Sequence, residues 1–234
     1  MRPIAHRGCL EQYPENTLLA FRRSAQDVGM IETDVRRCGS GELVMFHDDT
    51  LDRVTDATGE VGSTPIDVLS EVSILDSGEP IPQLRETFET VPTDVGLNLE
   101  LKGRGVAAET VSVADAYDHE VIVSSFYPDD IAAARDAGAT TAHLFYAEES
   151  ATFDIEAALD AAADLDCTCV HPNVELCLET EFVSKAYDRG FGVNAWTADT
   201  EAEVWALRER GVDGAVIDDC RFAAACREES YGPS

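Results

Sequence analysis

Short apolar segments with strand character alternate along the chain with amphipathic segments of helical period. The expected strands are 3–5, 30–35, 95–101, 121–124, 141–145, 168–170, 192–195 and 214–217, and the expected helices are 17–28, 84–90, 106–117, 129–137, 155–163, 181–188, 200–210 and 219–227. Such alternation favours a parallel sheet with right-handed crossovers. Eight units in 234 residues predict an α/β fold closed into a (β/α)8, or TIM, barrel. An open, doubly wound sheet is the alternative, but no glycine-rich dinucleotide-binding turn follows the first strand.

Residues 48–82 interrupt the alternation with segments rich in Asp, Thr and Gly. Loops this long inside compact domains are usually functional. We therefore expect one domain, residues 1–234, with an insertion at about 48–82 between the second strand and the second helix. Before the insertion, residues 42–46 should continue or pair with the second strand. No apolar run approaches the ~20 residues of a membrane helix, and no signal-peptide core is evident, so we expect a cytoplasmic protein without stable membrane insertion.

The chain carries 46 acidic residues against 17 lysines and arginines, which gives a formal net charge of −29. A surface this negative repels nucleic acid and anionic membranes, so we expect neither as a partner. The acids are dispersed through the expected helices, and only two of the bases are lysines. This pattern is typical of halophilic proteins, in which high salt screens the self-repulsion.

The seven cysteines are odd in number, and their spacings match no zinc-binding pattern. Because no secretion signal is evident, we expect buried free thiols rather than disulfides or metal ligands. Cys167 and Cys169 should face one side of a strand as small apolar groups.

Two carboxylates, Glu32 and Asp34, lie two residues apart in the expected strand 30–35. Alternate residues of a strand face the same side, so both side chains would point into a barrel. Like charges this close are costly unless a cation lies between them or one carboxylate takes a proton. The alternative is a solvated edge strand with two exposed acids.

Other polar and aromatic residues also stand at the C-terminal ends of expected strands, where the active sites of (β/α)8 barrels lie. The residues at these ends are His6, Arg7, Glu32, Asp34, His47, Glu100, Lys102, Phe126, Trp196 and Asp218. Their convergence on one mouth argues against the exposed edge strand. Carboxylates without thiolates favour a hard divalent cation, Mg²⁺ or Ca²⁺, over zinc.

Several motifs, in this order and spacing, resemble those of glycerophosphodiester phosphodiesterases. They are His6-Arg7-Gly8, Pro14-Glu15-Asn16-Thr17, Glu32-x-Asp34, His47-Asp48 with Leu51-x-Arg53-x-Thr55 and Gly59, Asn98-Leu99-Glu100-Leu101-Lys102, and Trp196-Thr197. Together these motifs cover nearly the whole chain, and the set is far more specific for the family than any single motif. An insertion in this family also accounts for the excursion at 48–82. The chain departs from the pattern at Asp199, where the family often has Asn.

The resemblance implies a role for each residue at the mouth. The metal ligands would be Glu32, Asp34 and Glu100, the general acid–base pair His6 and His47, and the phosphate contacts Arg7 and Lys102. Phosphodiester cleavage builds charge on the phosphoryl oxygens, which a cation and basic side chains stabilise, and on the leaving alkoxide, which a protonated histidine stabilises. Phe126 and Trp196 are either core residues or an apolar wall against which the glycerol lies.

The implied reaction is hydrolysis of glycerophosphodiesters to sn-glycerol phosphate and an alcohol. Whether water attacks directly, or a glycerol hydroxyl first forms a cyclic phosphate, is left open. A related phospholipase-type hydrolase of another headgroup would need an apolar rim or a basic surface. An inactive binding barrel would lack a histidine or a ligand, and all of these positions are present.

Several further polar residues are expected to serve the structure. The histidines expected to make structural hydrogen bonds are His119, His143 and His171. Asn16 should cap the first helix. Glu15 could support the site, and the alternative to a phosphate contact for Arg7 is that it only pairs with a carboxylate such as Glu15. Asp218 either belongs to the site or caps the last helix.

Overall fold

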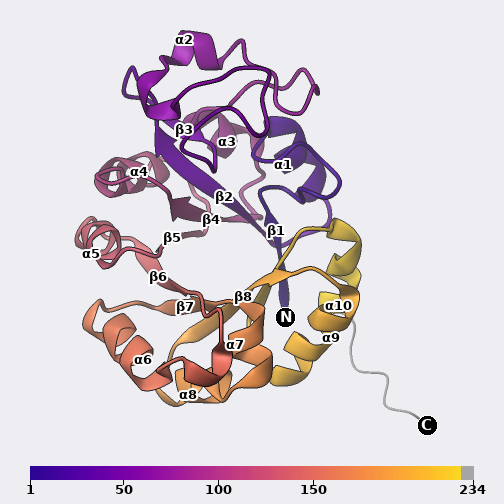
Figure 1. Ribbon diagram of the computed structural model, residues 1–234, viewed down its shortest axis with the longest axis vertical. Coiled ribbons are helices and arrows are strands. Elements are labelled where there is room, and N and C mark those ends of the chain that lie inside the picture. Colours follow the sequence, from indigo (N-terminus) through magenta and orange to yellow (C-terminus); the bar gives the residue numbers. More distant parts are fainter. Residues whose placement is uncertain (228–234) are drawn as a thin grey trace.

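The computed structural model describes residues 1–227, which form a closed barrel of parallel strands surrounded by helices (Figure 1). The strands are β1 (Arg2–His6), β2 (Met30–Arg37), β3 (Leu43–Met45), β4 (Gly96–Leu101), β5 (Val121–Ser125), β6 (Thr140–Phe145), β7 (Cys169–Pro172), β8 (Gly192–Ala198) and β9 (Gly214–Ile217). The first strand pairs in parallel with both β2 and β9, which closes the barrel. The predicted (β/α)8 barrel is therefore confirmed, and the open sheet is excluded.

The helices follow the strands in the expected order, although several differ in extent from the expectation and two short ones were not expected. They are α1 (Leu18–Ser24), α2 (Ile66–Leu69), α3 (Leu84–Thr90), α4 (Ala107–Ala114), α5 (Pro128–Asp136), α6 (Ile155–Asp164), α7 (Val174–Glu179), α8 (Phe182–Asp188), α9 (Glu201–Arg210) and α10 (Ala223–Arg227), with 3-10 turns η1 (Val61–Ser63), η2 (Ser150–Thr152) and η3 (Cys220–Phe222). The first helix ends at Ser24 rather than at residue 28. The unexpected α7 has six residues, too few for a helical period to be recognised in the sequence.

The segment between β3 and α3 packs over an apolar cluster of its own, beside the main barrel (Figure 1). Its buried members are Cys38, Val44, Phe46, Leu51, Val54, Val61, Leu69, Val72, Ile74 and Ile81. β3 runs antiparallel to β2, which settles how residues 42–46 meet the second strand. The assignment of residues 1–234 to a single domain stays a prediction.

The inside of the barrel changes from apolar to charged along β1 and β2. Ile4 and Met30 belong to a buried apolar cluster with residues of β5, β6 and β9. Two residues further along the same strands stand His6 and Glu32, which are neighbours in the parallel register. Because alternate residues share a face, the strands that build the apolar plug also carry charged side chains to the mouth.

Cys9 and Cys220 form a disulfide, with Cα atoms 5.7 Å apart. The expectation of free thiols is therefore wrong for these two, although the five other cysteines are unpaired. The bridge joins residues separated by 211 positions, which barrel closure brings together because β1 pairs with β9. Disulfides are rare in reducing compartments, and the cytoplasmic location stays a prediction. Among the described residues, no helix has the length and apolar character to cross a membrane.

We expect the double variant Cys9→Ala/Cys220→Ala to lose about 2–5 kcal/mol of unfolding free energy, because the cross-link restricts the unfolded chain. Urea-induced unfolding without reductant would measure the loss, with Cys169→Ala as a control that removes an unpaired thiol. Reductant should bring the wild-type protein to the level of the double variant and leave the variant unchanged. Equal unfolding free energies of the wild type and the double variant in the absence of reductant would contradict the bridge.

Candidate active site

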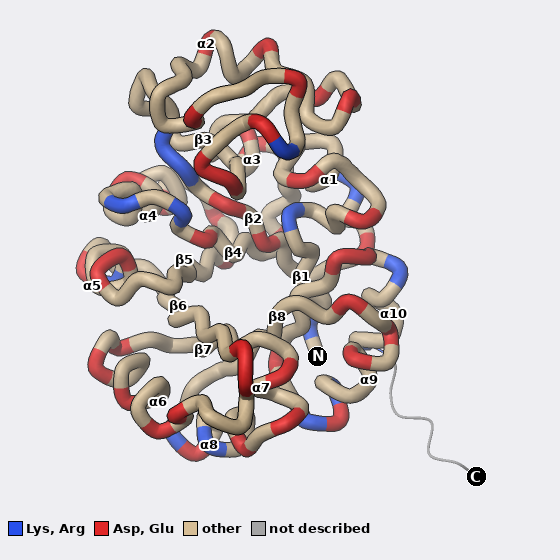
Figure 2. Tube along the Cα trace, viewed as in Figure 1, with Lys and Arg blue, Asp and Glu red and all other residues tan. Residues whose placement is uncertain are grey.

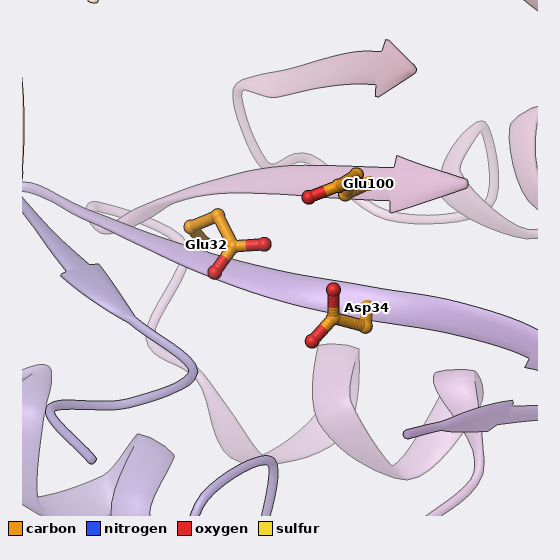
Figure 3. A group of neighbouring side chains, drawn as sticks. All are labelled: Glu32, Asp34 and Glu100. Carbon is orange, nitrogen blue, oxygen red and sulfur yellow. The ribbon is translucent and has the colours of Figure 1, made fainter. Parts of the chain in front are cut away.

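Three carboxylates from two neighbouring strands meet inside the mouth of the barrel (Figure 3). Glu32 and Asp34 share a face of β2, and Asp34 stands opposite Glu100 of β4 in the parallel register. One oxygen of each carboxylate lies within 4.8 Å of an oxygen of the other two. Glu32 is 4% exposed and Asp34 is 1% exposed. The structure thus brings together Glu32 and Asp34, which their spacing placed on one face, and Glu100, which was expected at the same mouth, and the group could hold a metal ion.

Burial and mutual repulsion make this cluster costly without a cation. Burial, followed by the Asp34 charge, raises the pKa of Glu32 to about 8. Burial also raises the pKa of Glu100, against the opposing effect of Lys102. Glu32 Oε1 and Asp34 Oδ1 are buried without a hydrogen-bond partner. Because hard divalent cations coordinate carboxylate oxygens of this kind, the donor set fits such an ion.

Two basic side chains offset the negative charge of the cluster. Lys102 Nζ lies 3.4 Å from Asp34 Oδ1 and 2.5 Å from Glu100 Oε1, and Arg7 Nε lies 3.3 Å from Asp34 Oδ2. Burial opposes ionisation of Asp34, but Lys102 and Arg7 outweigh it and lower its pKa to about 2. Asp34 is therefore held as a carboxylate, whereas burial and the neighbouring negative charge oppose the ionisation of Glu32.

Asn16 does not cap the first helix as expected. Its Nδ2 donates to Asp34 Oδ2 at 2.8 Å, and its Oδ1 accepts from the Thr33 hydroxyl at 2.7 Å. Thr17 provides the cap instead, since its side chain accepts from the backbone N–H of Ala20. Asn16 adopts a positive φ of 57°, a conformation that Asn tolerates better than most residues. The sequence around Asn16 reads as an ordinary helix start, and this use of the side chain was missed.

Glu15 supports the site from behind Arg7. Arg7 Nη1 donates to Glu15 Oε1 at 3.0 Å, and Arg53 of the insertion donates to both Glu15 oxygens at 2.8 and 2.9 Å. Arg7 thus contacts Glu15 and Asp34 together, so the expected pairing with Glu15 does not exclude the arginine from the site. Arg53 also contacts Asp48, which links the insertion to the mouth of the barrel.

Each histidine at the mouth is hydrogen-bonded to a carboxylate. His6 Nδ1 lies 2.5 Å from Asp218 Oδ1, and His47 Nδ1 lies 2.6 Å from Asp48 Oδ1. Burial favours the neutral form of His6, but the hydrogen bond to Asp218 and the charge of Glu32 outweigh it, so its pKa is raised. Burial lowers the pKa of His47 despite the opposing charge of Asp34 and hydrogen bond of Asp48. The pKa values of the two imidazoles are therefore shifted in opposite directions.

The residues that hold these histidines were only partly visible in the sequence. Asp218 belongs to the site, since its neighbour Asp219 is the residue that caps η3. Arg36 was missed entirely: its Nε and Nη2 donate to the backbone carbonyl of His47 at 2.9 and 2.7 Å. A basic residue near the end of a strand carries no signal for such a contact, which depends on the path of the insertion.

Aromatic side chains that directly follow β5 and β6 meet one from β8. The rings of Phe126 and Trp196 meet edge to face with centroids 5.5 Å apart, and the Tyr146 centroid lies 6.2 Å from that of Trp196. Phe126 also lines a cavity of about 380 Å³ together with His47 and Lys102. A substrate held at the carboxylates would therefore lie beside an apolar surface.

The other histidines make hydrogen bonds that hold the structure together, as expected. Their partners are the Val91 carbonyl for His119, the Phe126 carbonyl for His143, and the Asn194 side chain for His171. Burial lowers the pKa of His171 to about 3, so this imidazole stays neutral.

The family follows from comparison with known proteins. The model of the glycerophosphoryl diester phosphodiesterase family matches residues 6–221. The chain belongs to this family. It is 31% identical over 235 residues to the glycerophosphodiester phosphodiesterase of Caldanaerobacter subterraneus subsp. tengcongensis, a match that covers 92% of this chain and 93% of that protein.

Solved structures agree with the family and with the barrel. A phosphodiesterase of Oleispira antarctica, in complex with the product sn-glycerol-3-phosphate, superposes with a TM-score of 0.84 at 28% identity over 97% of each chain. The glycerophosphodiester phosphodiesterase of Thermotoga maritima gives 0.83 at 26% identity over 96% of this chain and 97% of the other. The resemblance drawn from the motifs is thus confirmed, and the chain is an enzyme of the phosphoric diester hydrolase class.

We expect Asp218→Asn to lower the pKa of His6, because the amide removes the carboxylate charge and the hydrogen bond that favour the imidazolium. NMR titration of the His6 ring protons would measure the shift. Asp219→Asn is the matched control, because Asp219 contacts Arg221. A His6 pKa unchanged by Asp218→Asn, or shifted equally by the control, would contradict the pairing.

Proposed function

We propose that this family member hydrolyses glycerophosphodiesters to sn-glycerol phosphate and an alcohol, with a divalent cation at its carboxylates and a pair of histidines as acid and base. The observation that carries the proposal is the cluster of Glu32, Asp34 and Glu100, in which Glu32 Oε1 and Asp34 Oδ1 are buried without a hydrogen bond. The product complex of the Oleispira antarctica relative supports the choice of substrate class.

The cation would be held by Glu32, Asp34 and Glu100, and oxygen ligands favour Mg²⁺ or Ca²⁺. When bound, it supplies positive charge to the phosphoryl oxygens. Arg7 and Lys102 add to this charge from fixed, largely buried positions, since their side chains are only 13% and 16% exposed. Preorganised charge of this kind stabilises a transition state without having to reorganise during the reaction.

His6 and His47 would serve as proton donor and acceptor on the two sides of the phosphate. A pair of this kind needs one protonated and one neutral imidazole, and the opposite directions in which the pKa values of His6 and His47 are shifted favour this division. Asp218 and Asp48 would orient the rings through their Nδ1 atoms, so that the Nε2 atoms would face the substrate; His6 Nε2 also lies 3.9 Å from Glu32 Oε2.

The glycerol backbone would lie against Phe126 and Trp196, which present apolar rings at the mouth. The expected partner is a small-molecule substrate, and the location is expected to be cytoplasmic. The acidic, lysine-poor composition favours a halophilic enzyme, so its activity and stability are best measured at high salt.

A phospholipase-type hydrolase of another headgroup remains the second candidate, because one observation favours it. Phe126, Tyr127 and Tyr146 are exposed by 37%, 53% and 57% where β5 and β6 end at the mouth, and such rings could contact an acyl chain. Faster hydrolysis of lysophosphatidylcholine than of glycerophosphocholine would favour this candidate over the proposed function.

We expect His6→Ala and His47→Ala each to lower the kcat for glycerophosphoglycerol roughly 10²–10⁴-fold, the usual contribution of a general acid or base. Release of glycerol would be measured with a coupled assay, with and without EDTA, and EDTA should abolish turnover by the wild-type enzyme. His119→Ala is the control, because this histidine bonds to the Val91 carbonyl away from the carboxylates. Full activity in both site variants would exclude the acid–base pair.

We expect Mg²⁺ or Ca²⁺ to raise the melting temperature of the wild-type protein, with about 2.7 kcal/mol of stabilisation at 100 times the dissociation constant. Glu32→Gln should abolish this response and raise the melting temperature in EDTA, because it removes a carboxylate from the repelling cluster. Glu120→Gln, which alters an exposed ion pair with Arg2, should respond to the cation like the wild type. An equal response in Glu32→Gln would mean that the ion binds elsewhere.

A further inference from the structure

A second cavity, of about 560 Å³, lies beside the reaction pocket. It is bounded by the end of β2, the insertion and the loop between β4 and α4, and its charged lining residues are Arg36, Arg37, Arg104, Asp49 and Glu60. Arg36 and Asp49 also line the cavity that contains His47, Glu100 and Lys102. The two cavities are therefore neighbours, and one elongated substrate could occupy both.

The lining is unusual for this chain, which has 46 acids and 17 lysines and arginines. Three of those bases face this one cavity, against two acids. Figure 2 shows Lys and Arg at the end of β2 and before α4, whereas Asp and Glu predominate around the lower part of the barrel. The lining thus carries one more base than acid, and such a cavity on a strongly anionic surface is a more favourable place for a small anion than the surface around it.

Arg104 has unused hydrogen-bonding capacity. Within residues 1–227 its guanidinium makes no hydrogen bond or ion pair; its Cζ lies 6.0 Å from the centroid of the Tyr127 ring. Arg104 is exposed, and its charge acts on Asp130 across the loop. Five N–H donors in a planar fork suit a phosphate.

Arg36 and Arg37 are already placed by other contacts. Arg36 is held by the His47 carbonyl and by Asp49, whose side chain is 87% exposed and free to exchange with a ligand anion. Arg37 donates to the Gly41 carbonyl and to Glu109, whose side chain is half-exposed. Because these contacts already order the two guanidinium groups, a ligand would lose little free energy in immobilising them on binding. Preorganised sites gain affinity in this way.

We propose that this cavity binds an anionic group, such as a second phosphate, on the alcohol half of the substrate. The inference rests on the proposed hydrolysis and specifies its substrate class: glycerophosphodiesters whose alcohol carries a further negative charge. Without such a cavity the chain would disfavour these substrates, because its net charge of −29 repels them.

The test compares two substrates that differ only by the second charge. Bis(glycerophospho)glycerol carries a second phosphodiester on the alcohol, and glycerophosphoglycerol does not. At fixed ionic strength, we expect the wild-type kcat/KM per cleavable bond to be about tenfold higher for the doubly charged substrate, as charge-assisted hydrogen bonds would provide. Arg104→Gln should lower this ratio about fivefold, whereas the exposed Arg23→Gln control should keep the wild-type ratio.

The possible outcomes separate this inference from the function on which it rests. Turnover of both substrates with a wild-type ratio near one, or a ratio unchanged in both Arg104→Gln and Arg37→Gln, would overturn the cavity assignment and leave the hydrolysis intact. No turnover of either substrate would overturn both. Inorganic phosphate is the third probe: inhibition that Arg104→Gln weakens, with an unchanged substrate ratio, would mean that the cavity takes free phosphate and not the substrate.

Discussion

The repulsion among three carboxylates, two of them buried and the third largely so, is the constraint on which the arrangement of the site depends. Glu32, Asp34 and Glu100 occupy one side of the barrel mouth, where water is too scarce to screen them. Arg7 and Lys102 are largely buried beside them, which holds Asp34 ionised while Glu32 is left with a raised pKa. The result is a compact set of oxygens that a divalent cation would stabilise, set beside the two cationic groups proposed to contact a phosphate.

Closure of the barrel brings to the mouth a histidine and an aspartate that β2 and β4 do not carry. Because β1 pairs with β9, residues from the two ends of the chain meet at the mouth, where His6 bonds to Asp218. The disulfide between Cys9 and Cys220 ties the same two segments together. The orientation of His6 and the cross-linking of the barrel thus have one topological cause.

The insertion acts as part of the mouth and not as a separate appendage. Arg53 joins Glu15 to Asp48, so a residue of the insertion contacts carboxylates behind both Arg7 and His47. In a chain this acidic, the described arginines that reach these carboxylates come from the loop after β1 and from the insertion. Basic residues are thereby concentrated where a phosphate is proposed to bind. Other arginines, Arg36, Arg37 and Arg104, line the neighbouring cavity.

The order of strands and helices, and with it the barrel, was determined by the sequence alone, because hydrophobic period is a local property. Spacing also placed Glu32 and Asp34 on one face, and the motifs identified the two histidines and the family. Tertiary structure alone decided the hydrogen bond from Asn16 to Asp34, the Cys9–Cys220 disulfide and the hydrogen bonds from Arg36 to the His47 carbonyl. These contacts join residues that are distant in sequence or that lie in irregular loops. Their geometry is set by barrel closure and by the path of the insertion, which no local pattern encodes.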